Sequence, residues 1–395
     1  MKTVSDTPEI KGWCPGALRP MQSGDGLVVR VRPRGGRPSP QDMRGIAGLS
    51  ARFGNGLIDL SARANVQLRG VTAEGHPDLI AGLRALGLID ASADAEARRN
   101  IVVSPFQAPG DGMAELARSL ADALVAEDAP QTPGKFGYAI DCGPLPVMRF
   151  VSADIRVERC ADGDLIVRPD GSDFGASATD ETAAATALAL ARWFLESGGA
   201  PEGRGRMAAL MGRGVGVPAR FSAVRASSLA AAEPGPGPTA QGFLVGFPFG
   251  QMQAETLAEL SGHGTLRVTP WRMLLVEGAT DVPRNADLIT DPKDPLRRVV
   301  ACTGAPGCPQ ALAATRPLAQ SIAGQIPQGA LAHVSGCAKG CAHPSKAALT
   351  LVARGPDGFD VVRKGRACDP PDVIGLSPAR ILSNPDLLTE LLNAP

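Results

Sequence analysis

The stretch HVSGCAKGCAHP, residues 333–344, decides the fold, because its cysteines Cys337 and Cys341 form a C-x3-C pair. A second pair, Cys302 and Cys308, stands upstream in CTGAPGC with C-x5-C spacing. Small and turn-forming residues between the cysteines let the backbone wrap closely around a compact inorganic core. Four thiolates from two loops suit a [4Fe-4S] cluster. Zinc sites usually have C-x2-4-C spacing in both halves, so zinc fits less well, and thiols without metal are a third option.

Composition sets outer bounds on the class of protein. The chain has 395 residues with 40 basic and 40 acidic side chains, which predicts two or three domains and argues against a general nucleic-acid binder. Arg192 interrupts the longest apolar run, so no membrane span is expected. The first 13 residues lack the apolar core of a signal peptide, which predicts a cytoplasmic protein whose eight cysteines are ligands, catalytic groups or buried thiols.

The chain contains an internal repeat. Residues 157–168 align with residues 352–363 at an offset of 195, and each segment reads as strand, Asp-Gly turn, strand. Residues 56–70 match residues 264–278 more weakly, and the linker EPGPGP at 233–238 separates the two copies. The sequence therefore predicts a duplicated unit with a site in the cleft between copies.

Only the second copy has the residues for a cluster. The offset places Cys142 on Cys337, but Pro146 stands where the second copy has Cys341. Cys142 is therefore expected to be a relic or a buried thiol. Cys160 and Cys368 are expected to be structural. Cys14 is expected either to be structural or to cover a site.

These motifs resemble a known superfamily. The two cysteine pairs, the duplication and the Ser-x-Arg-x-Asn-x-Gln-x-Arg-Gly-Val segment at residues 61–71 are similar to sulfite and nitrite reductases. Within that superfamily, CPGALRPMQSGDGLVVRVRP at residues 14–33, HVSGCAKGCAHP and the short length most resemble the precorrin-3B synthase family. The resemblance covers about residues 12 to 390.

The resemblance implies a duplicated α+β fold of the sulfite/nitrite reductase type. Ferredoxin-like half-domains would occupy residues 12–85 and 239–292. Larger α+β domains would occupy residues 95–232, without a cluster, and 296–390, with the [4Fe-4S] cluster. A pseudo-two-fold axis would relate the copies, with a tetrapyrrole held between them.

The family resemblance also implies an activity. It is the O2-dependent hydroxylation of the tetrapyrrole precorrin-3A at C20, with γ-lactone formation, in aerobic cobalamin (vitamin B12) biosynthesis. Such a monooxygenase uses NADH-derived electrons, and the chain has no dinucleotide or P-loop fingerprint, so a separate reductase or carrier is expected to deliver them. The alternatives are a sirohaem-dependent sulfite or nitrite reductase and a non-catalytic electron carrier.

The substrate carries eight carboxylates, which arginine forks bind well. Four cations match superfamily positions and are the predicted carboxylate ligands: Arg63, Arg69, Arg99 and Lys135. The reductases commonly have Lys-Phe-Lys or Lys-Phe-Asn where this chain has Lys135-Phe136-Gly137. Removing a cation weakens a site for a small anion, so Gly137 favours the synthase.

A mononuclear non-haem iron is associated with the family, and oxygenases often hold one with two histidines and a carboxylate. His333 and His343 flank the cysteine loop and are the candidate ligands. A hydrogen bond from either histidine to a cluster sulfur or a substrate carboxylate is the other option. Sirohaem is expected only if the chain is a reductase.

Overall fold

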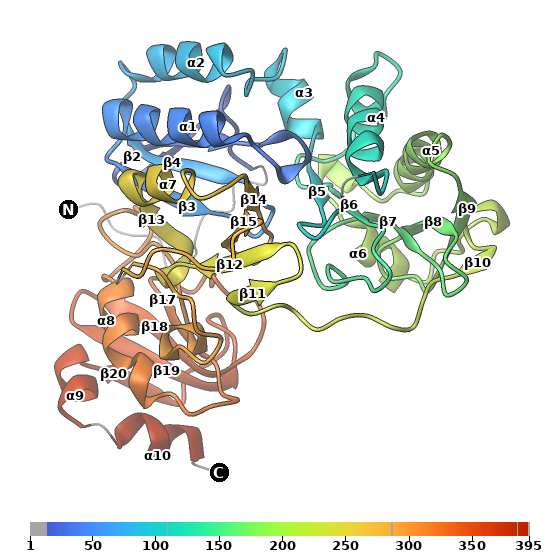
Figure 1. The fold of residues 1–395 in the computed structure, drawn as a ribbon. Coiled ribbons are helices and arrows are strands. Elements are labelled where there is room, and N and C mark those ends of the chain that lie inside the picture. Colours follow the sequence, from blue (N-terminus) through green and yellow to red (C-terminus); the bar gives the residue numbers. More distant parts are fainter. Residues whose placement is uncertain (1–13, 109, 286, 385, 394–395) are drawn as a thin grey trace.

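The computed structural model describes residues 14–108, 110–285, 287–384 and 386–393. Within these ranges the strands form four β-sheets, two small and two larger. In Figure 1 the small sheets lie together at the upper left and centre, the first larger sheet lies to the right, and the second lies below.

The first small sheet has the antiparallel order β1-β2-β4-β3 and gains β13 from the second copy at its β3 edge. Its strands are β1 (Met21–Ser23), β2 (Gly26–Val31), β3 (Leu57–Leu60), β4 (Val66–Val71) and β13 (Gln251–Gln253). Helices α1 (Pro40–Phe53) and α2 (His76–Ala85) cover one face. Ser39 begins α1 through a capping box with Asp42, which satisfies two free backbone N–H groups.

The second small sheet repeats the order as β11-β12-β15-β14. Its strands are β11 (Gly237–Thr239), β12 (Gly242–Gly246), β14 (Leu266–Val268) and β15 (Met273–Glu277). Helix α7 (Ala254–Leu260) packs against α1, and one apolar core includes buried residues from both small sheets. Residues 229–236 form no helix or strand, while Gly237 and Pro238, the end of the predicted linker, begin the edge strand β11.

The two larger sheets also match each other. One has the order β5-β6-β7-β8-β9-β10 and the other β16-β17-β18-β19-β20. In each, the first three strands are parallel and the next two pair antiparallel. The hairpins predicted at residues 157–168 and 352–363 are β7–β8 and β18–β19, so the repeat is confirmed. The residue limits of the four domains stay a prediction.

The bounds of these elements complete the fold. The first larger sheet consists of β5 (Ile101–Val103), β6 (Tyr138–Asp141), β7 (Ile155–Arg159), β8 (Leu165–Pro169), β9 (Phe174–Ala178) and β10 (Val224–Arg225). The second consists of β16 (Val299–Ala301), β17 (Ala332–Ser335), β18 (Ala347–Gly355), β19 (Gly358–Gly365) and β20 (Val373–Leu376). The helices are α3 (Ala93–Arg98), α4 (Met113–Val125), α5 (Ala183–Glu196), α6 (Met207–Gly212), α8 (Arg316–Ile322), α9 (Pro378–Ser383) and α10 (Leu387–Asn393).

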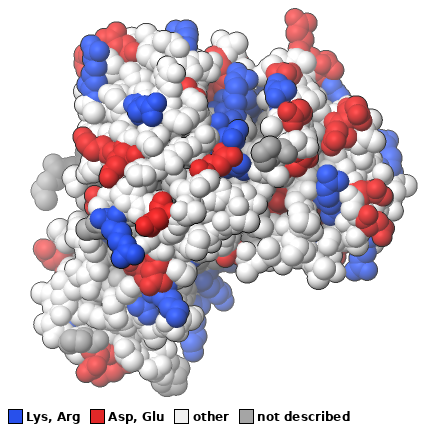
Figure 2. All heavy atoms as spheres, viewed as in Figure 1, with Lys and Arg blue, Asp and Glu red and all other residues white. Residues whose placement is uncertain are grey.

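Two surface properties bear on partners. Over the described ranges, no helix combines the length and apolarity that crossing a membrane requires. On the face drawn in Figure 2, basic and acidic side chains are interspersed, in keeping with a net charge of zero.

Candidate functional site

The first small sheet has one apolar and one polar face. The apolar face packs on α1 and α2, because alternate strand residues such as Val29 and Leu68 point into the shared core. On the other face, four strands in register contribute one polar side chain each to a row: Arg30, Gln67, Asp59 and Gln251. Hydrogen bonds link this polar row, from Arg30 to Gln67 Oε1 at 2.6 and 3.0 Å and from Gln251 to Asp59 at 2.8 Å.

The C-x5-C loop docks onto this polar face. Arg69, which is buried on β4, donates to the Gly307 carbonyl at 3.0 Å and binds Asp25 with both Nε and Nη2. From the other side of the contact, Arg316 at the start of α8 donates to Asp59 at 3.3 Å. Because these bonds join residues more than 230 positions apart, they fix the cysteine loop of the second copy against the sheet of the first.

The two cysteine loops lie against each other. Cys302 follows β16, and its Sγ accepts a hydrogen bond from the Gly336 N–H at 3.2 Å, just before Cys337. A Cβ at Gly336 would stand 2.6 Å from the Ala311 Cβ, so glycine permits this approach. Burial raises the pKa of Cys337, and nearby thiols, including that of Cys308, raise it further. Mutual repulsion of this kind is what a bound cation or metal cluster offsets.

Four thiols are the ligand chemistry of an iron-sulfur cluster. All four cysteines are free thiols, and burial together with the three other thiols also raises the pKa of Cys341. A cubane spreads its four thiolates over four irons. In the described ranges, no three His, Cys, Asp or Glu side chains are placed around one metal ion. The four-cysteine assignment stays a prediction.

The matching position in the first copy is closed. Cys142 is buried beneath the first larger sheet, and its thiol lies 3.8 Å from the Val157 carbonyl. Burial raises the pKa of Cys142 to about 12, so the thiol stays protonated. The sequence-based interpretation of Cys142 as a buried thiol therefore agrees with the structure.

Arg63 and Lys135 lie together at the edge of the polar face. Arg63 Nη2 donates to the Lys135 carbonyl at 2.9 Å, while its Nη1 is buried without a hydrogen-bond partner. A Cβ at Gly137 would lie 3.8 Å from that Nη1. A cavity of about 10 Å³ adjoins this nitrogen and is also lined by Asn100. A larger side chain at position 137 would point into this space.

Cys14 belongs to the same group of residues. Burial raises the pKa of its thiol, but the charges of Arg30, Arg63 and Lys135, with a hydrogen bond from Arg30, outweigh burial and leave the pKa below its ordinary value. Positive surroundings of this kind favour the thiolate. Cys14 therefore lies near Arg63 and Lys135, two of the predicted substrate-binding cations, and whether it covers a site stays a prediction.

The Arg99 side chain does not join Arg63 and Lys135. Its guanidinium is buried and binds Asp90 through Nε at 2.9 Å and Nη2 at 2.8 Å, and it also donates to the Arg32 carbonyl. The next residue, Asn100, lines the small cavity beside Arg63, whereas Arg99 lines a separate cavity. The structure thus brings Arg63 and Lys135 together but not Arg99.

The two candidate iron ligands are neighbours. The His333 and His343 rings pack edge to face, with centroids 5.8 Å apart. His333 on β17 is fully buried with both ring nitrogens unpartnered, and burial, then His343, lowers its pKa to about 4. His343 Nε2 lies 3.2 Å from the Lys346 carbonyl. The pair supplies two nitrogen donors, and the described part of the chain places no third metal-binding side chain with them.

Comparison with known proteins places the chain in a family. Residues 19–86 match the Nitrite/Sulfite reductase ferredoxin-like half domain. In an alignment 415 positions long, the chain is 30% identical to a Precorrin-3B synthase of Sinorhizobium sp. The alignment covers 90% of this chain and 83% of that protein. The chain belongs to the precorrin-3B synthase family. A ferredoxin–nitrite reductase of Synechococcus elongatus is 26% identical over 426 residues, covering 85% and 77% of the two chains.

A solved structure confirms the predicted fold for this precorrin-3B synthase family member. The NirA protein of Mycobacterium tuberculosis superposes with a TM-score of 0.59 at 17% identity, over 93% of this chain and 81% of that one. The duplicated α+β architecture of the sulfite and nitrite reductases is therefore the fold of this chain. The precorrin-3B synthase and ferredoxin–nitrite reductase relatives are oxidoreductase-type enzymes.

Sequence reasoning missed the polar row of this precorrin-3B synthase family member. Arg30, Asp59 and Gln67 lie on three strands, and only the strand register brings them into line. A signal was present in VVRVRP at residues 28–33, where arginines alternate with valines. Such alternation predicts a strand with one charged face, which needs a partner for its charge.

Proposed function

We propose that the chain is a precorrin-3B synthase, which hydroxylates precorrin-3A at C20 with O2 and closes the ring-A acetate into a γ-lactone. One observation carries this proposal: a buried, arginine-bearing sheet face lies against the C-x5-C loop, which in turn contacts the C-x3-C loop. A large polycarboxylate beside an electron-transfer centre requires that arrangement. The family assignment supports the same reaction.

The first step is to bind the substrate through its carboxylates. Arg63 and Lys135 lie at one edge of the polar face, and Arg69 lies where the cysteine loop meets it. Arginine forks bind carboxylates with two parallel hydrogen bonds, so separated cations fix the orientation of a macrocycle. Arg30 is an additional candidate, because its guanidinium lies beside Cys14, near Arg63. Arg99 is a candidate only for a peripheral carboxylate.

The second step is to deliver electrons. Cys302, Cys308, Cys337 and Cys341 would hold the [4Fe-4S] cluster, which supplies single electrons when bound. Inserting one oxygen atom of O2 into the substrate uses two electrons and two protons and releases the other atom as water. We propose that these electrons come from NADH through a separate reductase or carrier in the cytoplasm.

For His333 and His343 we propose a supporting role around the cysteine loop. A Cβ at Gly340, in the C-x3-C loop, would lie 3.6 Å from His333 Cε1, so the ring underlies that loop. The buried ring shapes the loop by packing. A mononuclear iron held by the pair would need a third ligand from elsewhere, such as the substrate or solvent.

A second candidate function is sirohaem-dependent reduction of nitrite or sulfite. Similarity to the ferredoxin–nitrite reductase favours it. Gly137 opposes it, because glycine contributes no cation or donor beside Arg63 Nη1, where the reductases commonly have a lysine or asparagine.

The visible spectrum of protein purified without air separates these functions. The synthase predicts a broad cluster absorbance, about four irons per chain for one cubane, and none of the sharp bands of sirohaem. Bound sirohaem after purification from cells that make it would contradict the synthase assignment. A colourless protein that contains zinc would contradict both enzymes.

A further inference from the structure

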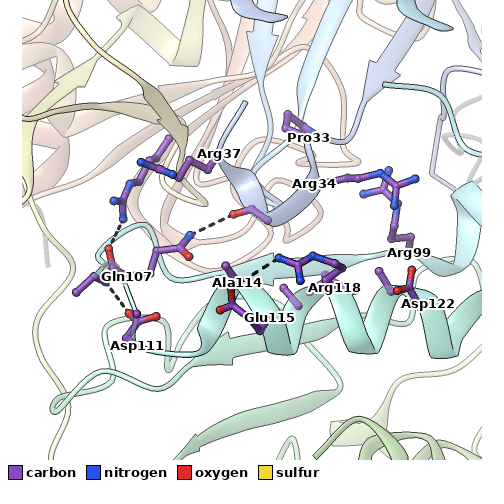
Figure 3. A pocket seen from close by; sticks show the side chains of 17 residues that line it. Pro33, Arg34, Arg37, Arg99, Gln107, Asp111, Ala114, Glu115, Arg118 and Asp122 are labelled. Carbon is purple, nitrogen blue, oxygen red and sulfur yellow. Dashed lines mark hydrogen bonds and ion pairs between the residues drawn. The ribbon is translucent and has the colours of Figure 1, made fainter. Parts of the chain in front are cut away.

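A cavity of about 630 Å³ is lined by none of the four paired cysteines. Figure 3 shows its walls: the segment Pro33–Arg37 on one side and helix α4 on the other. Its size is in the range of small-molecule sites. In Figure 2 basic side chains gather at the notch beside α4.

The repeat explains why this cavity is open in the first copy. The short helix η1 (Arg34–Gly36) precedes α1 just as η4 (Pro248–Gly250) precedes α7, so Gly35 corresponds to Phe249. Both residues have a left-handed backbone, with φ of 62° and 56°. Phe249 packs against the apolar core of the second larger sheet, whereas a Cβ at Gly35 would meet nothing within 4 Å. In the second copy the Phe249 ring thus fills the position that the first copy leaves empty at Gly35.

The charges of the cavity favour an anion at the η1 wall. Arg37 and Arg267 share one carboxylate, that of Glu277. Arg34 and Arg99 likewise share Asp90, but Arg34 only reaches it at 3.5 Å and its side chain is 59% exposed. Each pair therefore has one positive charge more than its shared carboxylate supplies.

The other wall is mixed, with apolar side chains and the carboxylates of Asp111, Glu115 and Asp122. Alanines of α4 form its floor, at positions 114, 117 and 121. Asp111 accepts hydrogen bonds from the backbone N–H groups of Ala108 and Met113, and Glu115 pairs with Arg118 at 3.7 Å. Arg267, on β14 at the opposite wall, is buried and donates to the Pro105 and Gln107 carbonyls, while its Nε has no hydrogen-bond partner among the described residues. Asp122 is the acidic side chain here for which the described contacts provide no partner.

We propose that this cavity binds an organic anion, a flat apolar ring system with one acidic group. The ring would lie on the α4 alanines in the space that Phe249 fills in the other copy. The acidic group would pair with Arg34. Charge-assisted hydrogen bonds to a partly desolvated arginine supply orientation as well as affinity. This site shares Arg99 with the predicted carboxylate ligands but is not lined by Arg63, Arg69 or Lys135, and the proposal does not rest on the proposed function.

Calorimetric titration of the purified protein with 8-anilinonaphthalene-1-sulfonate tests the proposal, because this probe is a flat ring system with one anionic group. We expect saturable binding of one molecule per chain. Gly35→Phe copies the residue of the second copy and should weaken binding at least about tenfold. Arg34→Ala should weaken it severalfold, and Arg354→Ala, on an exposed hairpin, should leave it unchanged.

Several outcomes would overturn the proposal. Binding of the probe that is unaffected by both Gly35→Phe and Arg34→Ala would place it elsewhere. Absence of saturable binding would show that the cavity takes no such anion. Binding of the cationic dye thioflavin T, lost in Gly35→Phe, together with no binding of the anionic probe, would assign the cavity to cations. Circular dichroism checks the fold of each variant. If Gly35→Phe does not fold, the binding measured with Arg34→Ala tests the proposal.

Discussion

The two small sheets have the same strand order but opposite charges at matching positions. In the first, Asp59 on β3 lies 3.7 Å from Arg69 on β4. In the second, 208 residues further along, Arg267 on β14 pairs with Glu277 on β15 at 2.7 Å. An ion pair has been kept at one place in the sheet while its direction is reversed, so the backbone register does not depend on which strand carries the cation.

The faces around these ion pairs differ more. Next to Arg267, the second sheet has Leu244 and Leu275 where the first has Arg30 and Gln67. The leucines form a small apolar cluster with Phe106 and Trp271 packed against it. Burying a polar row costs free energy unless it is bonded, whereas burying leucines is favourable. The first copy has retained the costly alternative, which we attribute to substrate binding.

The largest expected effect compares the matched cysteines. Cys337→Ser should abolish the visible cluster absorbance and most of the bound iron, because a serine hydroxyl is a poor substitute for a thiolate ligand. Cys142→Ser, at the corresponding place in the first copy, should leave both unchanged. Absorbance spectra and iron analysis of both variants measure this. Equal iron loss in the two variants, with both folded, would contradict the assignment of the cluster to one copy.

Substrate affinity should show the next effect. Arg63→Gln removes a cation whose Nη1 has no hydrogen-bond partner among the described residues, and Arg354→Gln removes one from an exposed hairpin as control. Losing a charge-assisted hydrogen bond of about 1.5–3 kcal/mol should raise the KM for precorrin-3A about tenfold or more, with a smaller change in kcat. An unchanged KM would remove Arg63 from the carboxylate site.

Stability tests the buried polar row. Asp59→Asn should lower the free energy of unfolding by about 1–3 kcal/mol, because Arg69 and Arg316 lose a charged partner in a buried setting. Asp360→Asn, which unpairs the exposed Arg354, should change it by less than about 1 kcal/mol. Denaturant unfolding of the variants provides both values. Equal small losses would indicate that water compensates the arginines.

The smallest effect concerns pH and the second sheet. Burial raises the pKa of Glu277, but hydrogen bonds from Arg37 and Arg267 outweigh it and lower the pKa to about 2. Because the folded pKa is depressed, the carboxylate stabilises the fold fully above its unfolded pKa of about 4.3, and this contribution is lost as pH falls towards 2. The stability difference between wild type and Glu277→Gln should therefore narrow from pH 6 to pH 3. A constant difference would contradict the shift.

The sequence predicted the features that depend on local spacing. The cysteine pairs, the linker and the hairpins at 157–168 and 352–363 are all readable along the chain, whereas the fold was implied by the family resemblance that these motifs carry. The polar row was not predicted, because Arg30 and Asp59 meet only through pairing of three strands. The direction of Arg99 was not predictable either, since motif position does not reveal that Asp90 holds its guanidinium.

Oxygen labelling of the product tests the proposed function most directly. Protein with its cluster intact is given precorrin-3A, reduced carrier and ¹⁸O2, and the product is analysed by mass spectrometry. The synthase predicts a product with one added oxygen atom that carries the ¹⁸O label. No labelled product from the intact, reduced protein, together with reduction of nitrite or sulfite by the same preparation, would contradict the proposal and assign the chain to the reductases.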